Sequence, residues 1–178
     1  MSLSKTKAGS GIPSEEVRCY NECLLNRCLQ VGDLIEFPRI GYSHWGVYVG
    51  GGQVIHLICL EGNIVKCCNP VTGAKRGEIK EEPFMKVAGT SKAKINNYKD
   101  NEMSRHSPVE IVKRAKRYKG LVEYKCGGCE MFVTWCRYGE GTCEQIQKVK
   151  TAVDYLRTAG LVTTVAAVAS FIVYRVTR

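Results

Sequence analysis

Two β-rich runs separated by three glycines constrain the fold of this chain more than any other feature. The runs are SHWGVYV, from residue 43, and QVIHLIC, from residue 53, and the glycines are residues 50–52. Two such runs around a short glycine-rich loop predict a β-hairpin. Further strands are expected at VGDLIEF, GNIVKCC and GEIKEEPF, with a weaker one near AKINNY. The chain is therefore expected to build an antiparallel sheet.

The predicted hairpin places two histidines on one face. If the three glycines form the loop, Val49 pairs with Gln53 and Gly46 pairs with His56. His44 and His56 are then diagonal neighbours whose Cα atoms lie roughly 7–8 Å apart. A register change of one residue would separate them, because side chains alternate between faces. Either histidine alone would be interpreted as structural, but two on one face indicate a functional pair.

Two segments outside the sheet predict amphipathic helices. The first spans residues 14–29, where apolar side chains recur at helical spacing: Val17, Tyr20, Leu24 and Cys28. The second follows Ser107, a good N-cap, with Pro108 at the first helical position and Glu110 completing a capping box. Gly120 is expected to end this second helix.

Cys129 opens a third predicted helix, CEMFVTWCRY, which Gly139 is expected to end. The positive end of the helix dipole favours a thiolate in the first turn. Cys129 shares one helical face with Phe132, Val133 and Cys136, and packing of that face on the sheet can bring Cys129 toward the histidines. A thiol beside an imidazole base is a strong nucleophile at neutral pH.

These positions favour a triad in which Cys129 is the nucleophile, His44 the general base and His56 the group that orients or polarises it.

The stretch KCGGC leaves other interpretations open. Cys126 and Cys129 have the spacing of a zinc knuckle, with Cys136 and Cys143 as the second pair. That second gap is not C-x-x-C, Cys136 falls on the expected core face, and the surroundings lack the βαβ pattern of a thioredoxin-like redox pair. We therefore expect no metal and no cofactor. A reversible disulfide between Cys126 and Cys129 that blocks the nucleophile is a further alternative.

The ten cysteines of the chain are expected to be free thiols. The polar start, MSLSKTKAGSG, shows no signal peptide, so we expect a reducing compartment. Cys19, Cys23 and Cys28 then serve packing, with S-acylation near a membrane as the alternative.

An excess of basic residues favours anionic partners. The chain has 26 Lys and Arg against 17 Asp and Glu, a formal charge of +9. No nucleic-acid motif or set of interleaved surface aromatics is present, so we expect no nucleic-acid partner. Five of the residues 113–119 are Lys or Arg. This helix would hold the domain against anionic lipid, each charge giving about 1 kcal/mol near such a surface, or would be a merely solvated face.

The C-terminal part differs from the rest of the chain in having a long uncharged stretch. Seventeen uncharged residues lie between Arg157 and Arg175, and as a helix they would be about 26 Å long, against a hydrocarbon core of ~30 Å. We expect a single-pass membrane anchor with the domain on the cytoplasmic face; a buried core helix is the alternative. The expected organisation is an N-terminal extension (1–30), a catalytic domain (31–150) and the anchor (151–178).

Several of these motifs together resemble the lecithin–retinol acyltransferase-like superfamily, most closely its small phospholipase A/acyltransferase branch. The matching segments are GDLIEF (32–37), GYSHWGVYVGGGQVIHL (41–57), VAGTSKAKINNY (87–98), SPVEIVKRAKRYKG (107–120) and GCEMFVTWCRYG (128–139). The resemblance implies an α+β fold, a circularly permuted papain-like domain related to NlpC-type peptidases. It assigns Cys129 as acyl-accepting nucleophile, His44 as general base and His56 as third member.

The resemblance also implies a function. A glycerophospholipid would give its sn-1 or sn-2 acyl chain to the cysteine, which passes it to water, a lysophospholipid or the amine of phosphatidylethanolamine. Phospholipids and the membrane surface are the implied partners. The family usually reads Asn-Cys-Glu-His-Phe here, and Gly128 and Met131 replace the Asn and the His. A catalytically weak, membrane-tethered interaction protein and a retinol acyltransferase are the alternatives.

Overall fold

The fold is organised by a five-stranded antiparallel sheet in the order β4-β3-β2-β1-β5. The computed structural model describes residues 11–60, 77–120, 128–144, 147, 148, 151, 152, 154 and 155. The strands are β1 (Leu34–Arg39), β2 (Tyr42–Gly50), β3 (Gln53–Cys59), β4 (Gly77–Pro83) and β5 (Lys94–Ile95). The mixed α+β class and the antiparallel sheet are therefore as the sequence predicts.

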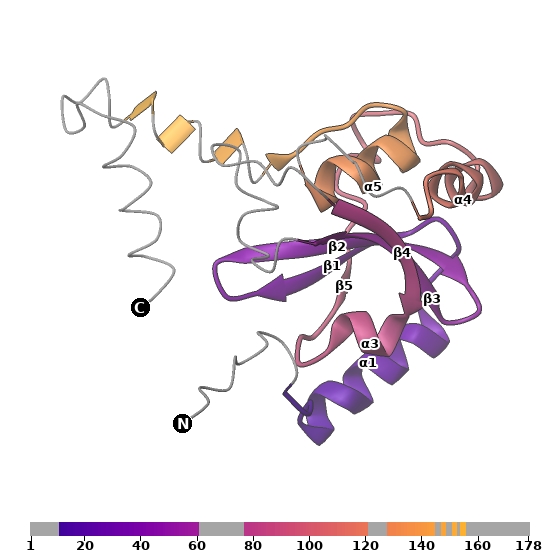
Figure 1. Cartoon of the computed structure of the whole chain (residues 1–178), viewed down its shortest axis with the longest axis vertical. Coiled ribbons are helices and arrows are strands. Elements are labelled where there is room, and N and C mark those ends of the chain that lie inside the picture. Colours follow the sequence, from indigo (N-terminus) through magenta and orange to yellow (C-terminus); the bar gives the residue numbers. More distant parts are fainter. Residues whose placement is uncertain are drawn as a thin grey trace.

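Helices cover both faces of this sheet (Figure 1). On one side lie α1 (Glu15–Arg27) and α3 (Phe84–Ala88), and on the other α4 (Pro108–Arg117) and α5 (Cys129–Tyr138). Each face has its own apolar cluster. Side chains of α4 and α5 pack on Leu34, Trp45, Val47, Ile55, Leu57 and Ile79, whereas those of α1 and α3 pack on Ile35, Phe37, Tyr48 and Val54. The alternation along β1, β2 and β3 thus divides the core into two layers.

The hairpin of β2 and β3 forms with the predicted pairing of Gly46 and His56. The expected pairing of Val49 with Gln53 is wrong, because an irregularity after Tyr48 leaves Gly50 opposite Gln53. The glycines of the loop have φ values of 90°, 58° and 72°, which other residues adopt only with strain. Since the irregularity lies on the loop side of Gly46, the register at the histidines is unaffected.

The start of α4 and the end of α5 follow the sequence signals, whereas α4 ends at Arg117, before the predicted Gly120. The Ser107 hydroxyl accepts a hydrogen bond from the Glu110 amide at 3.3 Å, and Pro108 occupies the first turn. The Glu110 carboxylate pairs instead with Arg114, at 3.4 Å. Gly139 ends α5 in the left-handed conformation, with φ of 86°. Both helices are confirmed.

The N-terminal helix is confirmed, but its buried face differs from the prediction. Asn21 is the buried residue of α1; its side-chain amide donates to the Ser91 carbonyl at 2.9 Å and accepts from the Ala93 amide at 3.0 Å. Tyr20 and Cys28, expected on the apolar face, are exposed. Helix α3 was not predicted, because five residues are too few for a periodic pattern.

Some expectations fall outside the described residues: the strand GNIVKCC with Cys67 and Cys68, the loop with Cys126, and the hydrophobic stretch between Arg157 and Arg175. Within the described ranges, no helix combines the length and apolar character that crossing a membrane requires. The C-terminal anchor therefore stays a prediction.

Gly46 is expected to be intolerant of a side chain. A Cβ atom there would lie 2.3 Å from Cγ1 of Val54 and 3.5 Å from Cβ of His56. Gly46→Ala should lower the free energy of unfolding by about 1–3 kcal/mol through overpacking. Urea denaturation of the Gly46→Ala and wild-type proteins measures this loss. Equal stability of Gly46→Ala and the wild-type protein would contradict the close packing.

Candidate active site

The two predicted histidines are in direct contact. Nε2 of His44 lies 2.8 Å from Nδ1 of His56, and the rings meet edge to face with centroids 5.0 Å apart. The contact follows from the pairing of Gly46 with His56, because a residue without a side chain beside His44 leaves room for the second imidazole. The structure thus brings His44 and His56 together on the face that the register predicts.

A carboxylate that the sequence analysis missed extends this pair. Nε2 of His56 lies 3.1 Å from Oε2 of Glu82, whose other oxygen accepts from Lys86 on α3. Glu82 pairs with Val54 in the sheet, so it lies diagonally across from His56 on the same face. GEIKEEPF was expected to be a strand, but its register against β3 could not be read from the sequence. Without that register, the sequence does not show which of Glu78, Glu81 and Glu82 lies beside His56.

The contacts define which ring nitrogens carry protons. An ionised carboxylate only accepts hydrogen bonds, so Nε2 of His56 donates to Glu82. Nδ1 of neutral His56 is then an acceptor, and the proton in its bond to His44 belongs to Nε2 of His44. His44 consequently carries its lone pair on Nδ1, the nitrogen that can take a proton.

Loss of hydration keeps both imidazoles neutral, His56 being buried and His44 partly buried. It is the largest cause that lowers the pKa of His44 well below its ordinary value, and the charges of His56 and Arg39 lower it further. Burial also lowers the pKa of His56, although Glu82 opposes it by charge and hydrogen bond. A neutral imidazole is the form in which a histidine acts as a general base.

Cys129 lies at the first residue of α5 and is buried, with 2% of its surface exposed. Its Sγ lies 4.0 Å from the carbonyl oxygen of Ser43, the residue before His44. Helix α5 packs through Phe132 on the sheet face opposite to that of the histidine pair. The thiol therefore meets β2 at the start of the strand, next to His44 in the chain, and not above the middle of the histidine face.

A buried carboxylate fixes the first turn of α5. Glu130, 1% exposed, accepts hydrogen bonds from the Tyr98 hydroxyl at 3.0 Å, the Cys143 thiol at 3.1 Å and the Glu144 amide at 2.8 Å. These donors come from the segment after β5 and from the chain that follows α5. The position of Cys129 is thus set by segments on either side of the helix in the sequence.

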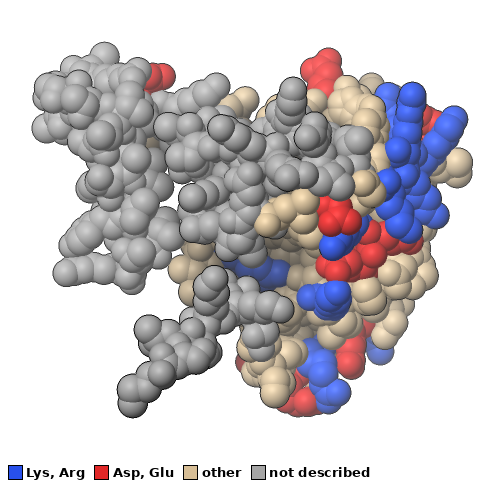
Figure 2. Space-filling view, viewed as in Figure 1, with Lys and Arg blue, Asp and Glu red and all other residues tan. Residues whose placement is uncertain are grey.

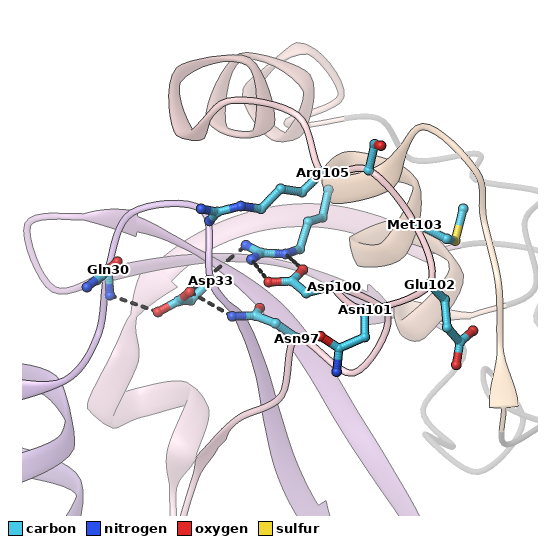
Figure 3. A pocket seen from close by; sticks show the side chains of 10 residues that line it. Gln30, Asp33, Asn97, Asp100, Asn101, Glu102, Met103 and Arg105 are labelled. Atoms are coloured by element: carbon cyan, nitrogen blue, oxygen red, sulfur yellow. Dashed lines mark hydrogen bonds and ion pairs between the residues drawn. The ribbon is translucent and has the colours of Figure 1, made fainter.

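The other end of α5 is fixed by a buried arginine. Arg137, 2% exposed, donates to both carboxylate oxygens of Asp100, at 2.8 and 2.6 Å, and to the Gly32 carbonyl at 2.8 Å. It lines a polar pocket of about 570 Å³, whose lining includes Asp33, Asn97 and Arg105 (Figure 3). Asp33 is held there by Gln30 and Asn97. Since this pocket lies at the C-terminal end of α5, away from Cys129, we interpret it as a structural network.

Gly128 precedes the thiol with φ of 106° and ψ of 179°. This region is essentially restricted to glycine, so the asparagine usual in the resembling family would be strained in this backbone. Met131, which replaces the usual histidine, packs beside Gly141. The backbone around Cys129 thus accommodates both departures from the family pattern, Gly128 and Met131.

Among the cysteines whose side chains the structure describes, Cys19, Cys23 and Cys28 are exposed, whereas Cys129, Cys136 and Cys143 are buried. Cys136 lies in the core cluster, and Cys143 donates to Glu130. In the part of the chain that the structure describes, no three His, Cys, Asp or Glu residues are placed to hold a metal ion.

Comparison with known proteins shows the relatives of the chain. A family model described as lecithin retinol acyltransferase matches residues 27–142, more than half of the chain. Phospholipase A and acyltransferase 4 of Homo sapiens is 34% identical over 149 residues, covering 81% of this chain and 90% of that protein. Phospholipase A and acyltransferase 1 of Homo sapiens is 34% identical over 153 residues, covering 79% and 88%. Phospholipase A and acyltransferase 3 of Mus musculus is 34% identical over 129 residues, covering 68% and 78%.

The depressed histidine pKa values predict a loss of stability in acid. Below the ordinary pKa of about 6.5 the unfolded chain binds protons that the folded protein does not, so the free energy of unfolding falls as pH falls. The slope contributed by each histidine is at most about 1.4 kcal/mol per pH unit. His44→Asn should therefore flatten the fall between pH 7 and 5 in urea denaturation, relative to the wild-type protein. An unchanged slope in His44→Asn would contradict a lowered pKa of His44 in the folded protein.

Proposed function

The chain belongs to the lecithin retinol acyltransferase family, and on that premise we propose that it is a thiol-dependent phospholipase A and acyltransferase. Cys129 is the nucleophile, His44 the general base and His56 the third member, on a permuted papain-like (NlpC-type) fold. The observation that carries the proposal is the 2.8 Å contact between His56 on β3 and His44 on β2, the strand that Cys129 touches. The names of the relatives, phospholipase A and acyltransferase, support the reaction class.

The first half of the reaction forms a thioester. Nδ1 of His44 takes the proton of the Cys129 thiol, and Sγ attacks the carbonyl carbon of a glycerophospholipid ester at sn-1 or sn-2. The bond between that carbon and the glycerol oxygen breaks, and the leaving oxygen takes the proton back from His44. A lysophospholipid leaves and the acyl chain stays on Cys129.

The second half returns the enzyme to its starting state. An acceptor hydroxyl or amine attacks the thioester carbon while Nδ1 of His44 takes its proton. The carbon–sulfur bond breaks and the thiolate regains the proton. Water as acceptor gives a fatty acid, a lysophospholipid gives a diacyl lipid, and the amine of phosphatidylethanolamine gives an N-acyl product.

The scheme requires Sγ of Cys129 to reach Nδ1 of His44. The approach of Sγ to the Ser43 carbonyl, one residue along β2, supports this. The positive end of the α5 dipole favours the thiolate that forms. The hydrogen bond from Nε2 of His44 to His56 leaves the base nitrogen on the opposite side of the ring, because the two nitrogens point apart.

The substrate is part of a bilayer, and we propose that the outer face of α4 holds the domain against anionic lipid. Lys113, Lys116 and Arg117 are exposed there, Lys119 is exposed just after the helix, and Figure 2 shows Lys and Arg side chains gathered at the upper right, where Figure 1 places α4. Lys119 pairs with Glu81, whereas Lys116 and Arg117 form no ion pair within the described ranges. Val109 on the same helix is 78% exposed and adds an apolar contact.

A covalent adduct tests the reaction. We expect the full-length protein, incubated with phosphatidylcholine vesicles that carry a labelled acyl chain, to gain one acyl mass in intact mass spectrometry. Cys129→Ser should lose the thioester, and Cys126→Ser and Cys23→Ser should keep it. If folded wild-type protein that binds the vesicles forms no adduct and releases no lysophospholipid, the enzymatic function is excluded. The tethered interaction protein then remains as the alternative.

Charge reversal tests the membrane contact. Lys116→Glu with Arg117→Glu should weaken binding of the full-length protein to vesicles containing phosphatidylserine by at least about 30-fold, from about 1 kcal/mol for each of the two basic residues lost. Binding to phosphatidylcholine vesicles should not change. Lys92→Glu with Lys94→Glu changes the net charge equally near the β5 edge and should have little effect. If both double variants lose equal affinity in co-sedimentation, net charge and not α4 explains the binding.

A further inference from the structure

Glu82 joins the histidine pair at the end away from Cys129. We propose that Glu82 is a positioning residue of the reaction, whose carboxylate fixes the tautomer of His56 and thereby directs Nδ1 of His44 at the thiol. The inference rests on the proposed function, which it extends by a fourth residue. Glu82 touches neither substrate nor thiol in this scheme and acts through His56.

The contacts of Glu82 are directional. One carboxylate oxygen lies 3.1 Å from Nε2 of His56 and the other accepts from Nζ of Lys86. Both partners come from rigid surroundings, since His56 lies inside β3 and Lys86 in α3, which begins directly after β4. The carboxylate is thus held from two sides in the orientation that accepts from His56.

Ionisation of Glu82 is favoured by its neighbours. Burial alone would raise the pKa of Glu82, but the hydrogen bond from Lys86 and the charge of His56 outweigh it and lower that pKa below its ordinary value. An ionised Glu82 cannot donate a hydrogen bond, so His56 must. The ionised carboxylate of Glu82 therefore excludes the opposite tautomer of the histidine pair, in which Nδ1 of His44 would carry a proton and could not accept one.

The other charges around the pair are positive. Arg39 on β1 lowers the pKa of His44, and Lys80 on β4 and Lys86 on α3 lower that of His56. When the thiol proton reaches His44, the positive charge of the pair is disfavoured by Arg39 at His44 and by Lys86 and Lys80 at His56, although Lys80 also pairs with Glu78 at 3.1 Å. Glu82 is the negative group that opposes them, so its loss should disfavour the protonated pair.

The experiment compares Glu82→Gln, Glu82→Leu and Glu81→Gln in the full-length protein. Glu81 neighbours Glu82 but points to the other face of β4, where it pairs with Lys119 at 2.7 Å, which makes it the matched control. We expect kcat for acyl release to fall about tenfold or more in both Glu82 variants, with KM unchanged. Glu82→Gln should also move the histidine-dependent limb of the kcat/KM profile to lower pH.

A second variant, for which the expected shift of the kcat/KM limb is in the opposite direction, separates positioning from a merely structural effect. Lys86→Met removes a cation that lowers the pKa of His56, so the same limb should move to higher pH. Loss of packing in α3 would lower activity without moving the limb in opposite directions for the two substitutions.

Nitrogen NMR of ¹⁵N-histidine-labelled protein gives a readout that does not depend on activity. Wild-type His56 should be protonated at Nε2, and Glu82→Leu should alter that signal whereas Glu81→Gln should not. The proposal is overturned if the Glu82 variants keep the wild-type kcat, pH profile and His56 tautomer. If the tautomer depends on Glu82 but the wild-type protein forms no thioester, the contact stands and the proposed function fails.

Discussion

The pairing of Gly46 with His56 across one β-hairpin is the constraint on which the rest of the site depends. Because Gly46 has no side chain, the two strands and the imidazoles of His44 and His56 approach closely. Burial of the rings keeps them neutral, and Glu82 sets which nitrogen of each carries the proton. The base of the proposed reaction is therefore a property of the sheet and needs no bound ligand to orient it.

The position of the Cys129 thiol depends on other contacts, those that fix helix α5. Helix α5 is fixed at its first turn through the buried Glu130 and at its last turn through the buried Arg137, so the helix that carries Cys129 is held at both ends. A buried carboxylate or guanidinium is costly to leave unpaired, and both are satisfied by donors or acceptors from segments distant in the sequence. The sheet and the helix, each rigid for its own reason, meet where Cys129 approaches the start of β2.

How much the sequence predicts depends on the range of the interactions involved. The capping residue Ser107, the terminating Gly139 and the alternation around His44 and His56 act over a few residues, and they predicted α4, α5 and the histidine contact. Asn21, Glu82 and Arg137 are different, because their partners lie far along the chain and depend on strand registers that periodicity does not define. For the same reason the sequence did not indicate that α5 covers the face opposite to the histidines, and the roles of Cys129, His44 and His56 in catalysis stay predictions.

The pH dependence of the alkylation of Cys129 by iodoacetamide tests most directly whether His44 and Cys129 form one unit. Peptide mass spectrometry measures the rate at Cys129 in wild-type protein, His44→Asn and the control His106→Asn. The account predicts that Cys129 of the wild-type protein reacts near neutral pH, and that His44→Asn moves its reactivity to the alkaline range of an ordinary thiol whereas His106→Asn does not. Identical profiles for all three proteins would contradict the account, because His44 would then have no influence on the proton of Cys129.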